Sequence, residues 1–301
     1  MPVASDGIGF SIIVPTYNRP VQLGQCLMAL ARLDYPRPRF EVVVVDDGST
    51  PPIDKIAHPF TERLDLTVLA ASNAGPAAAR NLGAAHAHGR YLVFTDDDCV
   101  PAPGWLRALD TRADAFPGAL LGGRTLNGLP DNLYSAVSQM VIEVVYAHYN
   151  ADPDHARFFA SNNLAAPADR FRALGGFDPD FSTAEDRDLC ERWLAHGGRL
   201  VYAADAVVRH AHALTLGGLW RQHFAYGRGA RRFHRTRANY GRSSFKIDAG
   251  FYRDLVISPY CRRGMRQAVP LTVLLFVQQV ANAAGFITEI FRPASPRPRG
   301  P

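Results

Sequence analysis

This 301-residue chain contains only two lysines, Lys55 and Lys246, and arginine carries the remaining basic charge. Arginine suits bidentate contacts to phosphate, although such a bias also follows genome composition. Cysteine is scarce as well: the four cysteines form no C-x-x-C pair. The N-terminus also lacks a basic flank followed by a long apolar core and a cleavage site. We therefore expect a reducing, cytoplasmic compartment.

A long uninterrupted apolar run is also missing. The best candidate, residues 267–291, is interrupted by Pro270, Gln278, Gln279, Asn282 and Glu289. A simple transmembrane helix of about 20 apolar residues is therefore not expected. The segment is flanked by Arg262, Arg263, Arg266 and Arg292. These arginines favour an amphipathic segment lying on a bilayer surface, but an ordinary helix packed on the catalytic core fits equally well.

Charge is distributed unevenly along the chain. Residues 209–299 contain sixteen Lys and Arg against three Asp and Glu, a net charge of +13, so residues 1–208 carry −8 within the overall +5. A basic C-terminal third suits phosphate or an anionic membrane surface, with a solvated basic face as the alternative. The length and the 47% hydrophobic content allow one large domain, or a domain with an appendage.

Short runs rich in branched residues indicate an α/β fold. They cover residues 10–14, 41–45, 66–70 and 91–94, and the segments between them are long enough for crossover helices such as 21–33 and 76–88. Residues 42–45 are apolar without alternation, which predicts a parallel strand covered by helices on both faces. Further along, we expect helices over 105–116, 131–149 and 183–195 and a short strand over 119–123.

Acidic residues follow two of these predicted strands. Asp96, Asp97 and Asp98 come after residues 91–94, and Asp46 and Asp47 come after residues 41–45. Open α/β sheets bind ligands at the carboxyl ends of their strands, so both groups should face one crevice. Clustered carboxylates repel one another unless a cation or a proton intervenes, and their hard oxygen atoms suit Mg²⁺ or Mn²⁺. A metal site is therefore expected at this edge, although an acidic D-x-D turn is by itself a weak signal.

Several further motifs occur in a fixed order. They are Pro15-Thr16-Tyr17-Asn18-Arg19, Asp46-Asp47-Gly48-Ser49, Asn73-x-Gly75-Pro76-x-x-x-Arg80-Asn81, Thr95-Asp96-Asp97-Asp98, Gly175-Gly176-Phe177-Asp178, Glu185-Asp186-x-Asp188-Leu189-Cys190-x-Arg192, His210 and Trp220-Arg221-Gln222-x-Phe224-x-Tyr226-Gly227. Together they resemble the family 2 glycosyltransferases of the GT-A fold over roughly residues 9–230. The resemblance implies a Rossmann-like, mostly parallel sheet flanked by helices.

The same resemblance divides the chain. Residues 1–230 would form the GT-A domain, with the nucleotide sugar bound by 1–125 and the acceptor and catalytic part in 126–230. Residues 231–292 would form a basic helical C-terminal extension that includes the membrane-surface candidate 267–291. Residues 293–301 are expected to be a disordered tail, since they are rich in proline and arginine.

The resemblance also implies a nucleotide site and a metal site. Tyr17 would pack on the base, Asp47 would accept a hydrogen bond from it, and Arg80 would contact the nucleotide or its phosphates. The metal ion, Mn²⁺ or Mg²⁺, would be held mainly by Asp98, with Asp96 and His210, while His212 is a weaker candidate. The complete expected nucleotide set is Pro15, Tyr17, Asn18, Arg19, Asp47, Arg80, Asp96 and Asp97.

Catalysis requires one carboxylate that removes the proton of the acceptor hydroxyl. The resemblance implies that this base is Asp186, in the first turn of the helix expected over 183–195, and that Glu185 orients the acceptor or supports the base. Helix capping is the alternative role for both acids. Asn163 is a candidate contact to the transferred sugar and Trp220 to the acceptor. A polar turn and an apolar packing face are the alternatives for these two residues.

The resulting prediction is an inverting transferase that moves a sugar from a nucleotide sugar, with UDP favoured, to a saccharide, glycolipid or lipid-linked acceptor of the cell envelope. Such an enzyme would be cytoplasmic, with peripheral contact to the inner face of the cell membrane. A sugar-phosphate nucleotidyltransferase is one alternative, but it would carry a glycine-rich basic loop where Pro15 to Arg19 stand. A silent nucleotide or polyanion binder is another, suggested by Arg231, Arg232, Arg235 and Arg237 interleaved with Phe233 and Tyr240. The intact acidic site argues against it, so no nucleic-acid partner is expected.

Overall fold

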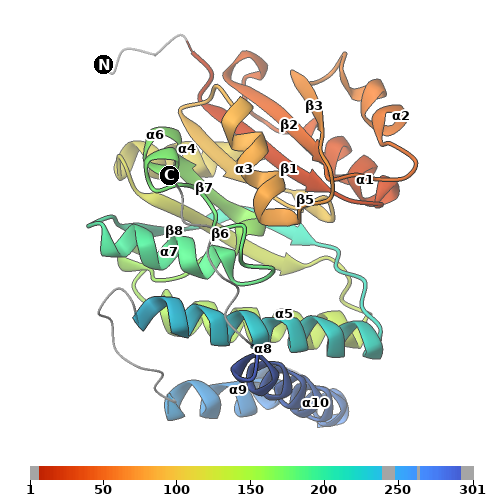
Figure 1. The fold of residues 1–301 in the computed structure, drawn as a ribbon, viewed down its shortest axis with the longest axis vertical. Coiled ribbons are helices and arrows are strands. Elements are labelled where there is room, and N and C mark those ends of the chain that lie inside the picture. The colour runs from red at the N-terminus through yellow and green to blue at the C-terminus, as the bar shows by residue number, and fades with distance from the viewer. Residues whose placement is uncertain (1–6, 239–247, 263–264, 293–301) are drawn as a thin grey trace.

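One curled eight-stranded sheet organises the protein, as the computed structural model shows for residues 7–238, 248–262 and 265–292 (Figure 1). The expected tail 293–301 and Tyr240 lie outside these described residues. The strand order is β3-β2-β1-β4-β7-β6-β8-β5. The strands are β1 (Phe10–Thr16), β2 (Phe40–Asp46), β3 (Leu66–Ala70), β4 (Tyr91–Phe94), β5 (Cys99–Pro101), β6 (Leu120–Asn127), β7 (Leu164–Pro167) and β8 (Leu200–His210).

Helices cover both faces of this sheet and continue past it. The α-helices are α1 (Pro20–Leu30), α2 (Asp54–Ala57), α3 (Pro76–His86), α4 (Trp105–Ala115), α5 (Leu133–Tyr149), α6 (Ala168–Ala173), α7 (Glu185–Ala195), α8 (Leu216–Ala238), α9 (Ala249–Arg262) and α10 (Met265–Ile290). Figure 1 shows α8, α9 and α10 gathered at the end of the molecule away from β1, β2 and β3. The extension is therefore helical, as the sequence predicted.

The N-terminal half is the parallel part of the sheet. Strand β1 pairs in parallel with β2 and β4, and β2 pairs in parallel with β3. Every residue of β2 is buried, which agrees with the unbroken apolar run that predicted two covered faces. Helix α3 lies very close to the sheet because a side chain at Gly83 would overlap Ile13. The expected βαβαβ unit is thus present.

The C-terminal half of the sheet is mixed. Strand β7 is antiparallel to β4 and β6, while β6 is parallel to β8 and β5 is antiparallel to β8. The β5 to β8 register places Cys99 opposite His210. This pairing brings the end of β8, which is far along the chain, next to the acidic turn that follows β4.

Helix α8 joins the sheet to the C-terminal helices. It runs without a break through residue 230, so the domain boundary expected there falls inside a helix. Side chains at Gly227 of α8 or Gly285 of α10 would overlap the backbone of the other helix, at Asn282 and Phe224 respectively. Arg228 Nε also lies 2.9 Å from Glu289 Oε2. The two helices are therefore packed backbone to backbone.

Helix α10 covers the segment for which the sequence predicted either an amphipathic helix on a bilayer surface or a helix packed on the protein. Its part Ala268–Ile290 is 23 residues long with a mean hydropathy of 1.5, so its length and composition suffice to cross a membrane despite the polar interruptions. The interruptions face the protein, since Gln278 is fully buried and Glu289 nearly so. The opposite side exposes a row of apolar residues: Val269, Val273, Phe276, Val280, Ile287 and Ile290. In this structure α10 is thus amphipathic.

Candidate active site

The acidic edge predicted from the sequence forms at the carboxyl ends of β1, β2 and β4. The parallel register aligns Thr16 at the end of β1 with Asp46 at the end of β2, and Asp97 follows β4. Thr16 Oγ1 donates to Asp97 Oδ2 at 2.8 Å, which ties the acidic turn to the first strand. Burial raises the pKa of Asp97 to about 6 even though Arg19 lies beside it. The expected convergence of both acid groups at one edge is present.

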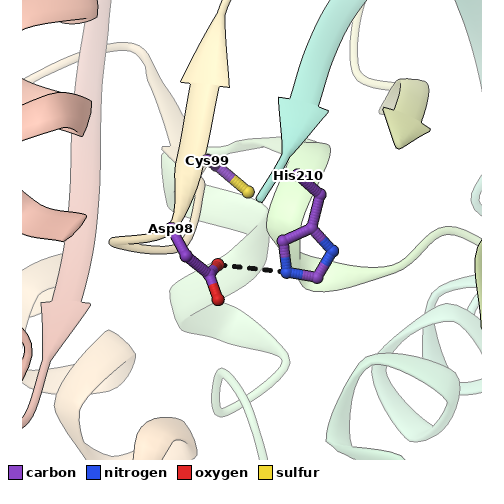
Figure 2. Close-up of side chains that lie close together, drawn as sticks. All are labelled: Asp98, Cys99 and His210. Atoms are coloured by element: carbon purple, nitrogen blue, oxygen red, sulfur yellow. Dashed lines mark ion pairs between the residues drawn. The ribbon is translucent and has the colours of Figure 1, made fainter. Parts of the chain in front are cut away.

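Asp98 and His210 meet at this edge (Figure 2). His210 Nε2 lies 3.0 Å from Asp98 Oδ1, and His210 is the last residue of β8. Burial acts to raise the pKa of Asp98, but His210 and Arg19 outweigh it and lower this pKa to about 2. Asp98 in turn raises the pKa of His210 in spite of burial. Asp98 is thus held as a buried carboxylate.

The Asp98 and His210 pair fits a divalent cation. Asp98 Oδ1 is buried without a well-aligned hydrogen bond, although His210 is within ion-pair distance. The 3.0 Å between the two atoms is also the separation of neighbouring ligands around an octahedral ion at about 2.1 Å. Cys99 Sγ lies in the same group, but burial raises the pKa of this thiol well above its usual range. A neutral thiol is a poor ligand, so Asp98 and His210 are the ligands that fit.

Arg19 supplies positive charge beside the same carboxylates. Its Nη1 lies 2.9 Å from Asp98 Oδ2 and 3.2 Å from Asp97 Oδ1. The Arg19 side chain is 44% exposed and can move away from the pair into solvent. The guanidinium therefore balances part of the acidic charge where the sequence predicted a nucleotide contact.

Arg80 holds a different position from the one expected. Its side chain is only 5% exposed, with Nη2 donating to Asp96 Oδ1 at 2.6 Å and Nη1 donating to Glu185 Oε1 at 2.9 Å. Both carboxylates raise the pKa of Arg80 against the effect of burial. A guanidinium buried between two carboxylates is not free to bind the phosphates directly. The structure instead makes Arg80 a bridge between the acidic turn and the first residue of α7.

Asp186 lies next to this bridge in the first turn of α7. Its Oδ1 accepts a hydrogen bond from the Arg187 amide at 2.7 Å, and its Oδ2 is 3.4 Å from the Ser161 amide. Burial, followed by the charge of Glu185, raises the pKa of Asp186 to about 7. A carboxylate with a pKa near neutrality accepts a proton far better than an ordinary aspartate. This geometry suits the role of general base.

The residues expected around the nucleotide line the loops after β1 and β2. Asp47 accepts hydrogen bonds from the Ala74 and Gly75 amides at 2.9 Å, which leaves each carboxylate oxygen one lone pair for a base N–H. Asn18 Oδ1 accepts from the Thr50 amide, so it links the two loops. Tyr17 is 46% exposed and presents its ring at the surface. Pro15 is partly buried near the end of β1.

Asn163 makes hydrogen bonds inside the protein. It is fully buried, its Oδ1 accepts from Trp105 Nε1 at 2.9 Å, and its Nδ2 donates to the Ala206 and Arg124 carbonyls. Its amide therefore joins α4 to the strand pair β6 and β8, as a structural residue. Trp220, by contrast, is 40% exposed near the start of α8 and remains available to a ligand. The Trp105 contact depends on long-range packing, so it was not predictable from the sequence.

Two contributors to the site were missed from the sequence. Thr16 belongs to the motif after the first strand, but its hydrogen bond to Asp97 depends on the neighbouring strands. The contact of the Ser161 amide to Asp186 depends on the packing of α7 against the residues before β7. A polar residue at the end of a parallel strand is the signal that would have pointed to Thr16.

Comparison with known proteins decides the family. Residues 11–172 match the sequence family described as Glycosyl transferase family 2, and residues 137–289 match Glycosyl transferase family group 2. The chain belongs to glycosyl transferase family 2. It is therefore a glycosyltransferase, and the family predicted from the motif order is confirmed.

Relatives of this glycosyltransferase agree with that assignment. Glycosyltransferase AglE of Haloferax volcanii is 28% identical over 226 residues, which covers 73% of this chain and 72% of AglE. The pre-mycofactocin glycosyltransferase of Mycobacterium tuberculosis is 29% identical over 216 residues, 68% of this chain. That match spans only 43% of the mycobacterial protein, so this glycosyltransferase is similar to part of it.

Solved structures share the fold of this glycosyltransferase. The mannosyltransferase PcManGT from Pyrobaculum calidifontis, in complex with GDP-Man and Mn²⁺, superposes with a TM-score of 0.67 at 20% identity, covering 95% of this chain and 88% of PcManGT. Residues 1–349 of TarS from S. aureus, in complex with UDP-GlcNAc, give a TM-score of 0.56 at 17% identity, with 94% and 90% covered. The predicted GT-A fold with a helical C-terminal extension is confirmed.

Proposed function

We propose that this glycosyltransferase transfers a sugar from a nucleotide sugar, with UDP favoured, to a hydroxyl acceptor with inversion at the anomeric carbon. One observation carries the proposal: Arg80 joins the acidic turn at Asp96 to Glu185, so the proposed base Asp186 stands beside the proposed donor site. The donor would be bound mainly by residues 1–125, and the acceptor would be bound by the part that contains α7 and the start of α8.

Asp186 would perform the proton transfer. Its raised pKa lets it take the proton of the acceptor hydroxyl while that oxygen attacks the anomeric carbon on the side opposite the nucleotide. Glu185 Oε1 accepts a hydrogen bond from Arg80 at 2.9 Å, so Glu185 would support Asp186 through this contact. A single displacement needs no second carboxylate as nucleophile, in contrast to retaining glycoside hydrolysis. The product would therefore have the inverted configuration.

The site would also have to stabilise the negative charge of the leaving group. Asp98 and His210 would hold Mn²⁺ or Mg²⁺, with Asp96 nearby, and the ion when bound neutralises charge on the departing diphosphate. Tyr17 and Asp47 would take the base, and Arg19 would approach the phosphates once it leaves Asp98. Nucleotide sugars bound to two proteins of the same fold, GDP-Man with Mn²⁺ and UDP-GlcNAc, support a donor of this class.

The acceptor would be a saccharide, a glycolipid or a lipid-linked molecule of the cell envelope, reached from the cytoplasmic side. The exposed apolar row of α10, with Arg266 before it and Arg292 after it, supports peripheral contact with an anionic membrane. One relative of part of the chain, the TarS enzyme of Staphylococcus aureus, is named as a poly(ribitol-phosphate) N-acetylglucosaminyltransferase, which supports an envelope acceptor.

A donor screen tests the proposed function. Purified protein is mixed with UDP and GDP sugars, and thermal stabilisation and donor hydrolysis are measured with and without Mn²⁺. We expect Mn²⁺-dependent stabilisation and slow hydrolysis by one donor. Asp186→Asn should retain the stabilisation and lose sugar transfer. Normal transfer by that variant would remove the base assignment, and pyrophosphate release from an NTP and a sugar phosphate would instead indicate a nucleotidyltransferase.

A further inference from the structure

A basic cavity of about 340 Å³ lies between α8, the end of α10 and the loop that precedes α7. Four guanidinium groups and two hydroxyl groups line it: Arg228, Arg232, Arg235, Arg292, Ser182 and Thr183. These groups are hydrogen-bond donors, and the guanidiniums have the planar fork that matches the oxygen atoms of phosphate. Nothing in the proposed donor site, the metal pair or the base uses this cavity.

The arginines of the cavity exceed the acids that could neutralise them. Glu289, which also lines the cavity, is taken by Arg228 at 2.9 Å, and Arg232 lies 3.1 Å from Asp180. Arg235 and Arg292 are exposed and have no acidic partner among the residues that the structure describes. Like charges gathered around one hollow repel each other, so a bound anion would stabilise the arrangement.

The cavity is fixed close to the proposed base. A side chain at Gly229 would overlap Thr183, and Thr183 Oγ1 donates to the Ala225 carbonyl at 2.9 Å, so α8 is pressed against the loop before α7. Asp186 follows Thr183 by three residues, which limits the distance between their Cα atoms to about 11 Å. The cavity and the proposed base are thus joined by three residues of chain, through the lining residue Thr183.

Exposed apolar residues are neighbours of the lining residues in the sequence. Ile290 and Phe291 come between the lining residues Glu289 and Arg292, and they are 49% and 81% exposed. Ile290 belongs to the exposed apolar row of α10, on the side of the helix away from Glu289. A ligand with a phosphate group and a hydrocarbon chain would contact the arginines with the phosphate and the end of α10 with the chain.

We propose that this cavity binds a phosphate or diphosphate group of the acceptor, which makes the acceptor a phosphorylated molecule. The assignment rests on the proposed function, because it requires Asp186 to be the base that receives the proton of this acceptor. The shared chemistry is a phosphate ester, whether it belongs to a soluble sugar phosphate or to the head group of a lipid carrier.

Binding of inorganic pyrophosphate tests the site directly. Calorimetry in EDTA compares the wild type with Arg235→Gln/Arg292→Gln and with the matched control Arg32→Gln/Arg37→Gln, which removes two exposed arginines far from the cavity in the sequence. We expect binding at least about tenfold weaker in the cavity variant, the loss typical of charge-assisted hydrogen bonds. The control variant should bind as the wild type does. Equal affinity of the cavity variant and the wild type would overturn the proposal.

Two phosphate monoesters distinguish the sources of the anion. Farnesyl phosphate and glucose 1-phosphate are titrated in the same way, and both should bind less tightly to the cavity variant. Tighter binding of farnesyl phosphate identifies a lipid carrier, whereas equal binding identifies a soluble sugar phosphate. Failure of both to bind the wild type would overturn the proposal.

Donor hydrolysis with Mn²⁺ separates this inference from the proposed function. If the wild type hydrolyses no nucleotide sugar, the proposed function fails and the acceptor assignment falls with it. If hydrolysis is normal in the wild type and the cavity variant, but the anions bind both equally, only the inference about the cavity fails.

Discussion

Arg80 Nη1 donates to Glu185 Oε1 at 2.9 Å, across 105 residues of sequence. The same guanidinium donates to Asp96 on its other side, so α3 physically joins the acidic turn after β4 to the first turn of α7. The charge of Arg80 also acts to lower the pKa of Asp186, against the effects of burial and Glu185. One buried side chain thus affects both halves of the proposed reaction site.

Arg80→Met should disturb stability and the pH profile together. Removal of the guanidinium leaves Asp96 and Glu185 without their partner, and breaking such a buried pair costs about 3–5 kcal/mol of unfolding free energy. Loss of the nearby positive charge should also raise the pKa of Asp186 and shift the rising limb of the kcat profile to higher pH. Denaturant unfolding and kcat against pH measure the two effects.

Arg107→Met provides the matched control for Arg80. Arg107 pairs with Asp34 at 3.0 Å, but both side chains are more than half exposed. An exposed ion pair is screened by solvent and contributes little to stability, so this variant should unfold almost as the wild type does. Equal losses of stability in the two variants, or an unchanged pH profile in Arg80→Met, would contradict the bridging role.

Sugar transfer should increase as the pH rises through about 7. Asp186 must be deprotonated to accept the proton of the acceptor, and burial raises its pKa to about 7. Initial rates at saturating donor between pH 5 and pH 9 measure this limb. A rate that is constant from pH 5 to pH 8 would contradict Asp186 as the base.

Stability should respond to the same group in the opposite direction. A pKa raised on folding means that the folded state binds the proton more tightly than the unfolded state, so Asp186 favours folding below about pH 4 and this contribution is lost as the pH rises to about 7. Asp186→Asn should therefore raise the melting temperature by a few degrees above pH 7. The gain should disappear near pH 4, and melting curves at the two pH values provide the check.

The affinity for Mn²⁺ should depend on Asp98 and His210 and should not depend on Cys99. Asp98→Asn and His210→Ala each remove one of the two atoms that face each other at 3.0 Å, so Mn²⁺ affinity in the presence of donor should fall at least about tenfold. Cys99→Ala should retain the wild-type affinity, because the buried thiol stays neutral. Titration with Mn²⁺ after removal of metal by EDTA distinguishes them. A large loss of affinity in Cys99→Ala would place the thiol among the ligands.

Membrane binding should depend on the exposed row of α10. Val273→Ser/Phe276→Ser removes two side chains that are 59% and 69% exposed, and burial of each in a bilayer would contribute about 1.5–3 kcal/mol. Co-sedimentation with anionic vesicles should fall at least about tenfold. Val21→Ser, which removes an exposed apolar side chain from α1, should have no effect. Equal recovery of all three proteins in the supernatant would exclude the membrane contact.

The fold was predictable where local pattern determines it, and less so where long-range pairing does. Residues 42–45 are apolar without alternation, so a covered parallel strand followed from the sequence alone. The position of His210 beside Asp98 depends on the antiparallel register of β5 and β8, and only the order of motifs pointed to it. Arg80 and Asn163 were assigned to ligands because the sequence does not reveal that Glu185 and Trp105 are their partners.

The amphipathic character of helix α10 was predictable from the sequence. Its polar residues interrupt the apolar run, and the helix places them on one face, where Gln278 and Glu289 are buried against the protein. The period of the helix, and not the length of an unbroken apolar run, determines what this segment presents to its surroundings.

The glycine contacts between α8 and α10 have a mechanical consequence. Because Gly227 and Gly285 let the two backbones touch, α10 cannot tilt or slide without carrying α8, and α8 carries the arginines of the cavity and presses on the loop before Asp186. Binding of α10 to a lipid surface would therefore determine how far the proposed base lies from the bilayer. Gly227 and Gly285, which lack side chains, would then determine which acceptor groups near the membrane the enzyme can use.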